Sequence, residues 1–223
     1  MLSVSDIVVG YEPGNPVLRG TSLEIHPGEV VGLAGPSGIG KSTLAKVMCF
    51  LLQPEQGTVA IDGQEVTRFG YRAPRAQRTS VGVVFQSPRR SVDPRLTVRE
   101  LIMEPLLAAK VAAQHHAERM TEAIEMAGLT DELLRRRPHE VSDGQLQRAC
   151  VARAIVLRPT YLVCDEMTAM LDAPSTATVV RAIRAVVEHR GTGVLAISHD
   201  EDLLGVWADR IVWLDEELPQ PLP

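Results

Sequence analysis

A short glycine-rich run near the N-terminus constrains the fold of this chain more than any other feature of the sequence. The run matches G-x-x-x-x-G-K-[ST] and reads Gly35-Pro36-Ser37-Gly38-Ile39-Gly40-Lys41-Ser42-Thr43. It follows an apolar segment, Val30–Ala34, and opens a helical pattern over Lys41–Leu52. A strand, a phosphate-binding loop and a helix are therefore predicted in that order, rather than a glycine-rich turn with a chance Lys-Ser pair.

The chemistry of this run is that of a site for nucleotide phosphates. Glycines let successive backbone N–H groups turn towards phosphate oxygens, and the helix N-terminus adds its partial positive charge. Lys41 would bring a positive charge to the β- and γ-phosphates, and the Ser42 hydroxyl would bind Mg²⁺. The run predicts nucleotide binding but not the kind of nucleotide-binding protein.

A second apolar strand ends in two carboxylates. The segment Tyr161–Cys164 is followed directly by Asp165 and Glu166. A continuous apolar run is typical of a strand buried on both faces, and a parallel sheet presents its ligand at the carboxyl ends of its strands. Asp165 would hold Mg²⁺ through its water, and Glu166 would polarise the attacking water as a general base. A buried strand that merely meets a polar turn is the alternative.

Two further polar residues follow predicted strands. His199 comes after Val194–Ser198, where it could donate a hydrogen bond to the γ-phosphate. Gln86 comes after Val81–Phe85 and offers an amide to Mg²⁺ or to the attacking water. Either residue alone is also explained as an ordinary polar residue at a strand end.

The alternation of strand and helix patterns predicts an α/β domain with a largely parallel core sheet. Strands are predicted at Ser3–Val9, Ser22–His26, Val30–Ala34, Thr58–Ile61, Val81–Phe85, Tyr161–Cys164, Val194–Ser198 and Arg210–Leu214. Helices are predicted at Lys41–Leu52, Thr97–Ala113, Ala117–Ala127, Gly144–Leu157, Pro174–Arg190 and Glu201–Trp207. The early strands, up to Ile61, are expected to form an antiparallel edge sheet.

Composition limits the setting in which the chain works. Its 223 residues carry a net charge of -5, which argues against a general nucleic-acid binder. The three cysteines form no metal-ligand spacing, which favours a reduced cytosolic setting. The start does not resemble a signal peptide, and no stretch approaches the roughly 18 apolar residues of a membrane span. If the protein serves a membrane, another chain is expected to cross it.

One segment identifies a particular family of phosphate-loop proteins by resemblance. It reads Val141-Ser142-Asp143-Gly144-Gln145-Leu146-Gln147-Arg148. It resembles the L-S-G-G-Q signature of ABC-transporter ATP-binding subunits. The phosphate loop, Gln86, the Asp165–Glu166 pair, Asp172 and His199 stand in family order around it, so the resemblance covers residues 3–215. Kinases, GTPases and other P-loop families do not carry this set.

The resemblance implies roles for individual residues. Tyr11 corresponds to the aromatic residue that stacks on adenine, although a turn tyrosine is the alternative. Ser142 and Gly144, with Gln145 in the same motif, correspond to groups that reach the γ-phosphate of a second subunit's nucleotide. Asp172 corresponds to the acidic residue that contacts the opposite phosphate loop. Gln86 corresponds to the residue that links γ-phosphate chemistry to the transmembrane partner. Glu166 corresponds to the general base, and His199 to the switch histidine.

The resemblance also implies a domain plan and a set of partners. It places the first part of an ATP-binding core, with an antiparallel β subdomain, at 1–93, and the signature motif and the second part of the core at 141–217. Independently of the resemblance, the stretch 94–140 lacks strand signals and is expected to form an inserted helical subdomain. A disordered tail is expected at 218–223, because Glu217–Pro223 contains three prolines. The expected ligands are ATP and Mg²⁺. The expected partners are a second ATP-binding subunit, either a copy or a sister chain, transmembrane permease subunits and an extracellular solute-binding protein, at the cytoplasmic face of the cell membrane.

A narrower resemblance is to the peptide/nickel importer branch. It rests on Val84–Val98, Glu104-Pro105-Leu106 and Arg137-Pro138-His139-Glu140. An importer of peptides, nickel or metal chelates is expected from it. An exporter subunit, an ABC ATPase acting on nucleic acid or ribosomes, and a soluble P-loop kinase are the alternatives, and the solute stays open.

The sequence departs from the family pattern at a few positions. Asp143 replaces the first signature glycine, Ile39 replaces a small residue of the phosphate loop, and Met167, Ala169 and Met170 replace the usual Pro, Ser and Ala. Asp143 matters most, because a carboxylate would stand close to a docking γ-phosphate. Either the side chain points away, or it weakens one ATP site, which would favour a sister chain as the dimer partner.

Overall fold

The computed structural model describes residues 1–12 and 14–214, and its centre is a five-stranded parallel sheet. The strands lie side by side in the order β6 (Val81–Val84), β7 (Tyr161–Asp165), β8 (Gly193–Ile197), β3 (Val30–Ala34) and β9 (Arg210–Trp213). Every residue of β3 and β8 is buried, as their apolar sequences predict. The strand that leads into the phosphate loop is therefore flanked by β8 and β9.

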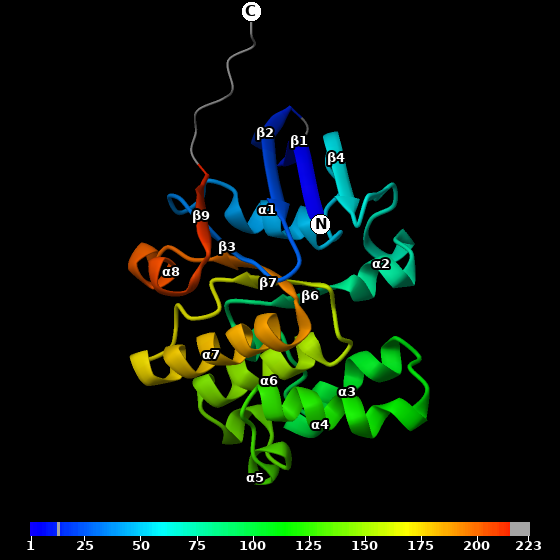
Figure 1. Ribbon diagram of the computed structural model, residues 1–223, viewed down its shortest axis with the longest axis vertical. Coiled ribbons are helices and arrows are strands. Elements are labelled where there is room, and N and C mark those ends of the chain that lie inside the picture. Colours follow the sequence, from blue (N-terminus) through cyan, green and yellow to red (C-terminus); the bar gives the residue numbers. More distant parts are fainter. Residues whose placement is uncertain (13, 215–223) are drawn as a thin grey trace, which may run out of the picture.

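A second, antiparallel sheet is built mainly from the N-terminal segment. Its order is β2 (Asn15–Ile25), β1 (Leu2–Glu12), β4 (Gln56–Ile61) and β5 (Gln64–Glu65). It lies with α1 (Lys41–Met48) on one side of the parallel sheet, and most of the other helices lie on the opposite side (Figure 1). These other helices are α3 (Val98–Ala108), α4 (His116–Met126), α5 (Asp131–Leu134), α6 (Asp143–Ile155) and α7 (Ala173–Arg190). The short α2 (Arg75–Ser80) precedes β6, and α8 (Glu201–Trp207) precedes β9.

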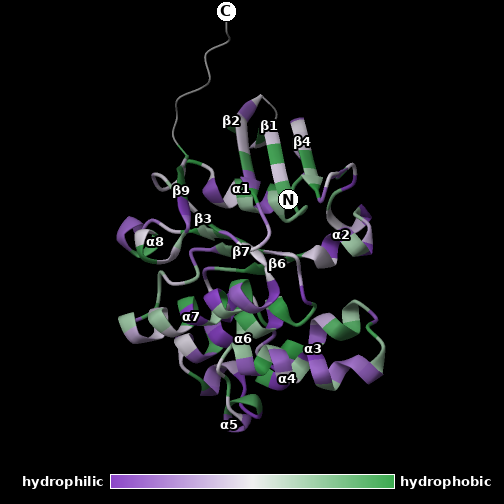
Figure 2. Ribbon diagram, in the orientation of Figure 1, coloured by the Kyte–Doolittle hydropathy of each residue, from purple (hydrophilic) through white to green (hydrophobic). Residues whose placement is uncertain are grey.

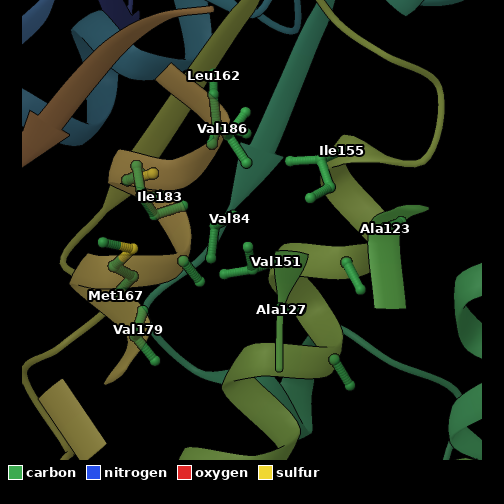
Figure 3. Packing of buried hydrophobic residues seen from close by; sticks show 14 of the residues in the cluster. Val84, Ala123, Ala127, Val151, Ile155, Leu162, Met167, Val179, Ile183 and Val186 are labelled. Carbon is green, nitrogen blue, oxygen red and sulfur yellow. The ribbon is translucent and has the colours of Figure 1, made fainter. Parts of the chain in front are cut away.

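Alternate residues of the parallel strands pack into two separate cores. Val30 and Ala34 of β3 join the core that contains α6 and α7, whereas Val31 and Leu33 join the core under the antiparallel sheet. In the first core, side chains of β6 and β7 meet those of α4, α6 and α7 (Figure 3). Figure 2 shows the apolar colour concentrated along the central strands and polar colour over much of the helical side. Because these strands pack on both faces, the positions of their C-terminal ends, which carry the polar residues, are fixed.

The predicted fold class is confirmed, with parallel and antiparallel sheets and a group of helices between β6 and α6. Several predicted ends are wrong. The first helix stops at Met48 rather than Leu52, because the chain turns at Phe50, which has φ 60° and a buried side chain. The helix that begins near Thr97 stops at Ala108 rather than Ala113, before Lys110 with φ 49°.

Other predicted bounds also change. The second strand begins at Asn15 rather than Ser22, because it pairs with β1 along a hairpin that closes at Glu12 and Asn15. Helices α2 and α5 and strand β5 were not predicted; they are two to six residues long, too short for a clear periodicity. The domain bounds stay predictions, and the tail over 218–223 lies outside the described residues. No helix of the described part is both long and apolar enough to cross a membrane.

Candidate active site

The phosphate loop joins β3 to α1 and has the backbone shape that its glycines predict. Gly35, Gly38 and Gly40 have φ of 142°, 85° and 113°. A Cβ at Gly35 would lie 2.4 Å from the Leu214 carbonyl oxygen, so a side chain would not fit there. No side chain caps the N-terminus of α1, which leaves its first N–H groups available to an anion.

Lys41 lies inside this loop. Its side chain is buried, and its ammonium donates hydrogen bonds to the carbonyl oxygens of Gly35 and Pro36 at 2.6 and 2.9 Å. These bonds hold the positive charge within the curve of Gly35–Thr43, where the backbone N–H groups also gather. The arrangement fits the predicted contact with nucleotide phosphates.

The Ser42 hydroxyl and the Asp165 carboxylate meet, although they are 123 residues apart in sequence. The hydroxyl donates a hydrogen bond of 3.1 Å to Asp165 Oδ1. Burial raises the pKa of the Asp165 carboxyl, the Ser42 hydrogen bond offsets part of that increase, and the negative charge of Glu166 adds to it. Both groups are hard oxygen ligands of the kind that Mg²⁺ prefers, and a cation would stabilise the ionised carboxylate. These residues fit a magnesium site.

Glu166 lies between two other predicted site residues. Gln86 Nε2 donates a hydrogen bond of 2.9 Å to Glu166 Oε2, and His199 Nδ1 is 3.6 Å from Oε1. The backbone of Glu166 is left-handed, with φ 47°, and its N–H donates to the Ile197 carbonyl oxygen. The polar residues at the ends of β6, β7 and β8 therefore converge on one carboxylate, in a backbone conformation that costs energy and is common at functional sites.

Tyr11 lies against α1, beside the phosphate loop. Its hydroxyl is 3.3 Å from the Thr43 hydroxyl and accepts a hydrogen bond of 2.9 Å from Lys46, whose ammonium is 5.1 Å from the ring centroid. The hydrogen bond with Lys46, followed by that with Thr43, lowers the pKa of Tyr11. Tyr11 is 59% exposed, so its position agrees with a surface for a flat base. Its role in binding adenine stays a prediction.

The predicted signature residues form a second group at the start of α6. The Ser142 hydroxyl accepts a hydrogen bond from the Gln145 N–H, and the Gln145 side chain accepts one from the Ser142 N–H, at 3.2 and 3.0 Å. This is a capping box. A Cβ at Gly144 would lie 2.6 Å from Ser175 Oγ, so the glycine allows α6 to pack closely on α7.

Asp172 completes this second group by capping α7. Its carboxylate accepts a hydrogen bond of 2.8 Å from the Ser175 N–H. The Ser175 hydroxyl, followed by this N–H, lowers the pKa of Asp172. Within residues 1–12 and 14–214, no hydrogen bond or ion pair joins Ser142, Gly144, Gln145 or Asp172 to the phosphate loop. The structure thus brings the predicted residues together in two separate groups, one around Lys41 and Glu166 and one around Ser142 and Asp172.

Two further residues of this region lie within motifs recognised in the sequence but were assigned no role from it. Gln147 is fully buried, and its amide donates a hydrogen bond of 3.2 Å to the Phe85 carbonyl oxygen, next to Gln86. Arg89 Nη1 and Nη2 donate to the carbonyl oxygens of Pro138 and Val141 at 2.7 and 3.0 Å. No spacing rule links Arg89 to residues some 50 positions away, so nothing in the sequence identified its role.

Asp143 also contacts Arg89. Arg89 Nε lies 2.7 Å from Asp143 Oδ1, an ion-pair contact rather than a well-aligned hydrogen bond. The sequence left open whether this side chain points away or weakens one ATP site; the structure shows its carboxylate directed to Arg89, a contact that the sequence did not predict.

Comparison with known proteins agrees with this geometry. The family model described as ABC transporter matches residues 18–169, which is more than half of the chain. The chain belongs to this family. The nickel import ATP-binding protein NikE of Escherichia coli O6:K15:H31 (strain 536) is 36% identical, over 96% of this chain and 84% of the relative. A putative peptide import ATP-binding protein of Brucella ovis is 35% identical, over 96% of this chain and 69% of the relative.

A solved structure extends the agreement to three dimensions. The dimeric post-hydrolysis structure of the ATP-binding cassette MJ0796, bound to ADP and Pi, superposes with a TM-score of 0.83 at 27% identity, covering 96% of this chain and 94% of that chain. This ABC protein is an ATP-binding subunit with ATPase activity. The resemblance to the family, and to relatives named for nickel and peptide import, is confirmed.

Proposed function

We propose that this ABC subunit hydrolyses ATP with Glu166 as the general base. The observation that carries the proposal is the convergence of Gln86 and His199 on the Glu166 carboxylate, at 2.9 and 3.6 Å. A carboxylate held from two sides has a fixed direction in which to accept a proton from water. Gln86 would orient the water, and His199 would contact the γ-phosphate.

The phosphate end of ATP belongs in the loop beside this carboxylate. Backbone N–H groups of Gly35–Thr43 and the Lys41 ammonium would bind the phosphates, with Tyr11 against adenine. Ser42, Asp165 and Gln86 would hold Mg²⁺, which supplies charge neutralisation at the phosphates when bound. Asp165 and Glu166 thus have different tasks, the first with the metal and the second with the water.

We propose further that two subunits close head-to-tail around ATP. Ser142 and Gly144 stand at the N-terminus of α6, where backbone N–H groups and the helix dipole favour an anion. In one chain, this group makes no hydrogen bond or ion pair with the phosphate loop across the described residues. A second subunit, a copy or a sister chain, would bring the two groups together at each ATP, and Asp172 would contact the opposite loop.

The Glu166→Gln variant tests both proposals. It should bind MgATP normally, hydrolyse it ~10²–10⁴-fold more slowly and accumulate as an ATP-bound dimer, because the amide keeps the shape but not the base. Turnover at constant protein concentration and analytical ultracentrifugation with and without MgATP are the measurements. Normal turnover would exclude Glu166 as the base. Slow turnover in a species that stays monomeric with MgATP would exclude ATP-driven dimerisation.

The proposed role is import of peptides, nickel or metal chelates, together with permease subunits and an extracellular solute-binding protein at the cytoplasmic face of the membrane. The names of the relatives from E. coli and Brucella ovis support this class of solute. ATPase activity of the reconstituted complex, with the binding protein loaded with Ni²⁺, a metal chelate or a peptide, identifies the solute as the one that stimulates turnover. Stimulation by none of these would exclude the class.

A cluster of exposed arginines suggests which kind of permease segment contacts this subunit. The stretch Val66–Val84 contains no Asp or Glu, although the whole chain carries a net charge of -5. We define the basic patch as the exposed arginines of this stretch, Arg68, Arg72, Arg75 and Arg78. None of them forms an ion pair in the part of the chain that the structure describes. Arg68 and Arg72 line a surface hollow with Leu51 and Tyr71, which are 56% and 96% exposed. We propose that an acidic cytoplasmic segment of the permease, with an apolar side chain, docks there.

Charge reversal tests this docking surface. Arg72→Glu should weaken the binding of this subunit to the permease while leaving ATP binding by the isolated chain unchanged. Arg19→Glu is the matched control, since it reverses an exposed arginine of β2 outside the basic patch. Equal permease binding by the two variants would remove the docking proposal.

A further inference from the structure

Asp143 places a negative charge where the proposed ATP contact needs positive potential. It is the first residue of α6, directly after Ser142. A carboxylate in the first turn interacts favourably with the helix dipole, and in doing so it competes with any other anion that approaches the same N–H groups. A γ-phosphate docking at Ser142 and Gly144 would therefore meet both the helix N-terminus and a like charge.

Arg89 supplies the opposite charge. The contact of 2.7 Å between Arg89 Nε and Asp143 Oδ1 pairs the carboxylate with a guanidinium. The other two nitrogens of the same guanidinium bind the carbonyl oxygens of Pro138 and Val141, at 2.7 and 3.0 Å. Val141 immediately precedes Ser142, so one side chain holds the signature segment on both sides of its serine.

The position of Arg89 along the chain links the two residue groups. Arg89 lies in the short 3₁₀ turn Pro88–Arg90, three residues after Gln86. Gln86 contacts Glu166 in the first group, and Arg89 contacts Asp143 in the second. A short segment therefore joins the carboxylate proposed as the base to the loop proposed to bind the other subunit's nucleotide.

We propose that Arg89 is a positioning residue that neutralises Asp143 and fixes the signature loop, so that Ser142 and Gly144 can receive a γ-phosphate despite the carboxylate beside them. The proposal rests on the head-to-tail dimer described above. Both members of the pair are half-exposed, with side-chain exposures of 46% each, so the effect belongs to local charge and loop position rather than to a buried core.

ATP-driven dimerisation in the Glu166→Gln background tests this proposal. Arg89→Ala should weaken the MgATP-bound dimer about five- to tenfold, because Asp143 is left unpaired near the phosphate. Asp143→Asn combined with Arg89→Ala should restore part of the lost affinity, because it removes the unpaired charge but not the loss of the Arg89 hydrogen bonds to Pro138 and Val141. Arg90→Ala is the matched control: it removes the neighbouring arginine, whose side chain makes no hydrogen bond or ion pair in the described segments, and it should dimerise like the parent.

Two results would overturn the proposal. One is an Arg89→Ala dimer as tight as the Arg90→Ala dimer. The other is a loss of dimer affinity in Arg89→Ala that Asp143→Asn does not reduce, together with a melting temperature, measured without nucleotide, below those of the parent and of Arg90→Ala. That result would assign Arg89 a structural role only.

A separate measurement distinguishes this inference from the dimer proposal. If the Glu166→Gln parent itself stays monomeric with MgATP, the proposed dimer is wrong. Hydrogen–deuterium exchange of the segment 138–147 then decides the positioning role: exchange should be faster in Arg89→Ala than in Arg90→Ala. Equal exchange in the two variants would exclude it.

Discussion

The two groups of site residues are held in place in different ways. The group around Lys41 and Glu166 stands at the ends of strands that are buried on both faces. Its carboxylates are close together and are contacted by a hydroxyl, an amide and a histidine. The group around Ser142 stands at helix N-termini, and Arg89 beside it contacts one carboxylate and two backbone carbonyl oxygens.

The two regions also differ in how the charges of their carboxylates are balanced. Near Glu166, burial and the neighbouring negative charge raise the pKa of Asp165 despite the Ser42 hydrogen bond and the nearby lysines, as expected where a cation is to bind. Near Asp143 the charge is already paired within the chain. The first region is therefore built to receive charge, whereas the second is built to hold a loop in position.

The largest expected effect is the loss of nucleotide binding on replacing Lys41 in the first region. Lys41→Ala should weaken MgATP binding about 30-fold or more, because it removes the buried charge that we propose to face the phosphates. Equilibrium binding of a fluorescent ATP analogue measures the change. Lys46→Ala removes an ammonium from the same helix but one bound to Tyr11, and it should have a much smaller effect. Equal losses in the two variants would contradict the assignment of Lys41 to the phosphates.

The first region could be predicted from sequence, because its signals are local. Each polar residue follows an apolar run of five residues or so, and parallel strands gather such ends at one edge. The contacts of Gln86 and His199 with Glu166 therefore agree with what strand order implies. The orientation of Glu166, with its left-handed backbone, was not predictable, since it depends on packing against β8.

The second region was predicted only through family resemblance. The capping box of Ser142 and Gln145 has a recognisable sequence form, S-x-x-Q. The partners of Asp143 and Gly144 come from distant segments, Arg89 and Ser175, and the reason for them lies in tertiary packing. Helix ends were misplaced for a similar reason, since the burial of Phe50 stops α1.

A smaller effect is expected from Gly144→Ala in the second region. Alanine is normally favoured over glycine in a helix by about 1 kcal/mol. Here the new Cβ would lie 2.6 Å from Ser175 Oγ and 2.8 Å from Ser175 Cβ, so α6 or the first turn of α7 must shift. We expect a net destabilisation of ~1–3 kcal/mol. Gly205→Ala in α8, where no atom lies within 4 Å of the added Cβ, should instead be neutral or stabilising. Urea unfolding of both variants measures the difference, and a stabilised Gly144→Ala would show that the packing is loose.

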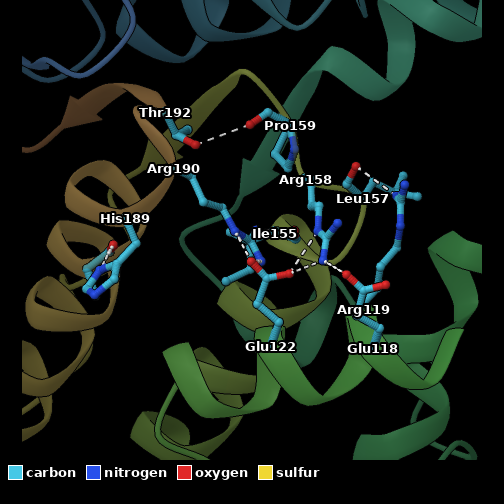
Figure 4. Close-up of polar contacts among 11 residues, drawn as sticks. Glu118, Arg119, Glu122, Ile155, Leu157, Arg158, Pro159, His189, Arg190 and Thr192 are labelled. Atoms are coloured by element: carbon cyan, nitrogen blue, oxygen red, sulfur yellow. Dashed lines mark hydrogen bonds and ion pairs between the residues drawn. The ribbon is translucent and has the colours of Figure 1, made fainter. Parts of the chain in front are cut away.

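The smallest effect concerns an arginine network at the C-terminal ends of α6 and α7, the ends opposite to Ser142 and Asp172 (Figure 4). The Glu122 carboxylate of α4 accepts hydrogen bonds of 2.8 Å from Arg158 Nε, after α6, and from Arg190 Nε, at the end of α7. Arg190 Nη1 also donates to the Ile155 carbonyl oxygen at 2.8 Å, so the network ties three helix segments together. Burial alone would raise the pKa of Glu122, but the hydrogen bonds from Arg158 and Arg190 outweigh it and leave the pKa below its ordinary value.

A lowered pKa fixes the direction of the pH dependence. The stabilising contribution of Glu122 is fully present above the pKa of the unfolded chain and is lost as the pH falls through the lower pKa of the folded protein. Glu122→Gln should therefore reduce the free energy of unfolding by about 1 kcal/mol at pH 7, and the difference from the parent should shrink as the pH falls below about 4.5. Glu132→Gln is the matched control, because Glu132 pairs with Arg136 on a more exposed surface, with 75% of its side chain accessible, and should change stability little. Denaturant unfolding from pH 7 down to pH 3 measures both. A difference for Glu122→Gln that stays constant with pH would mean that the glutamate contributes by packing and not by its charge.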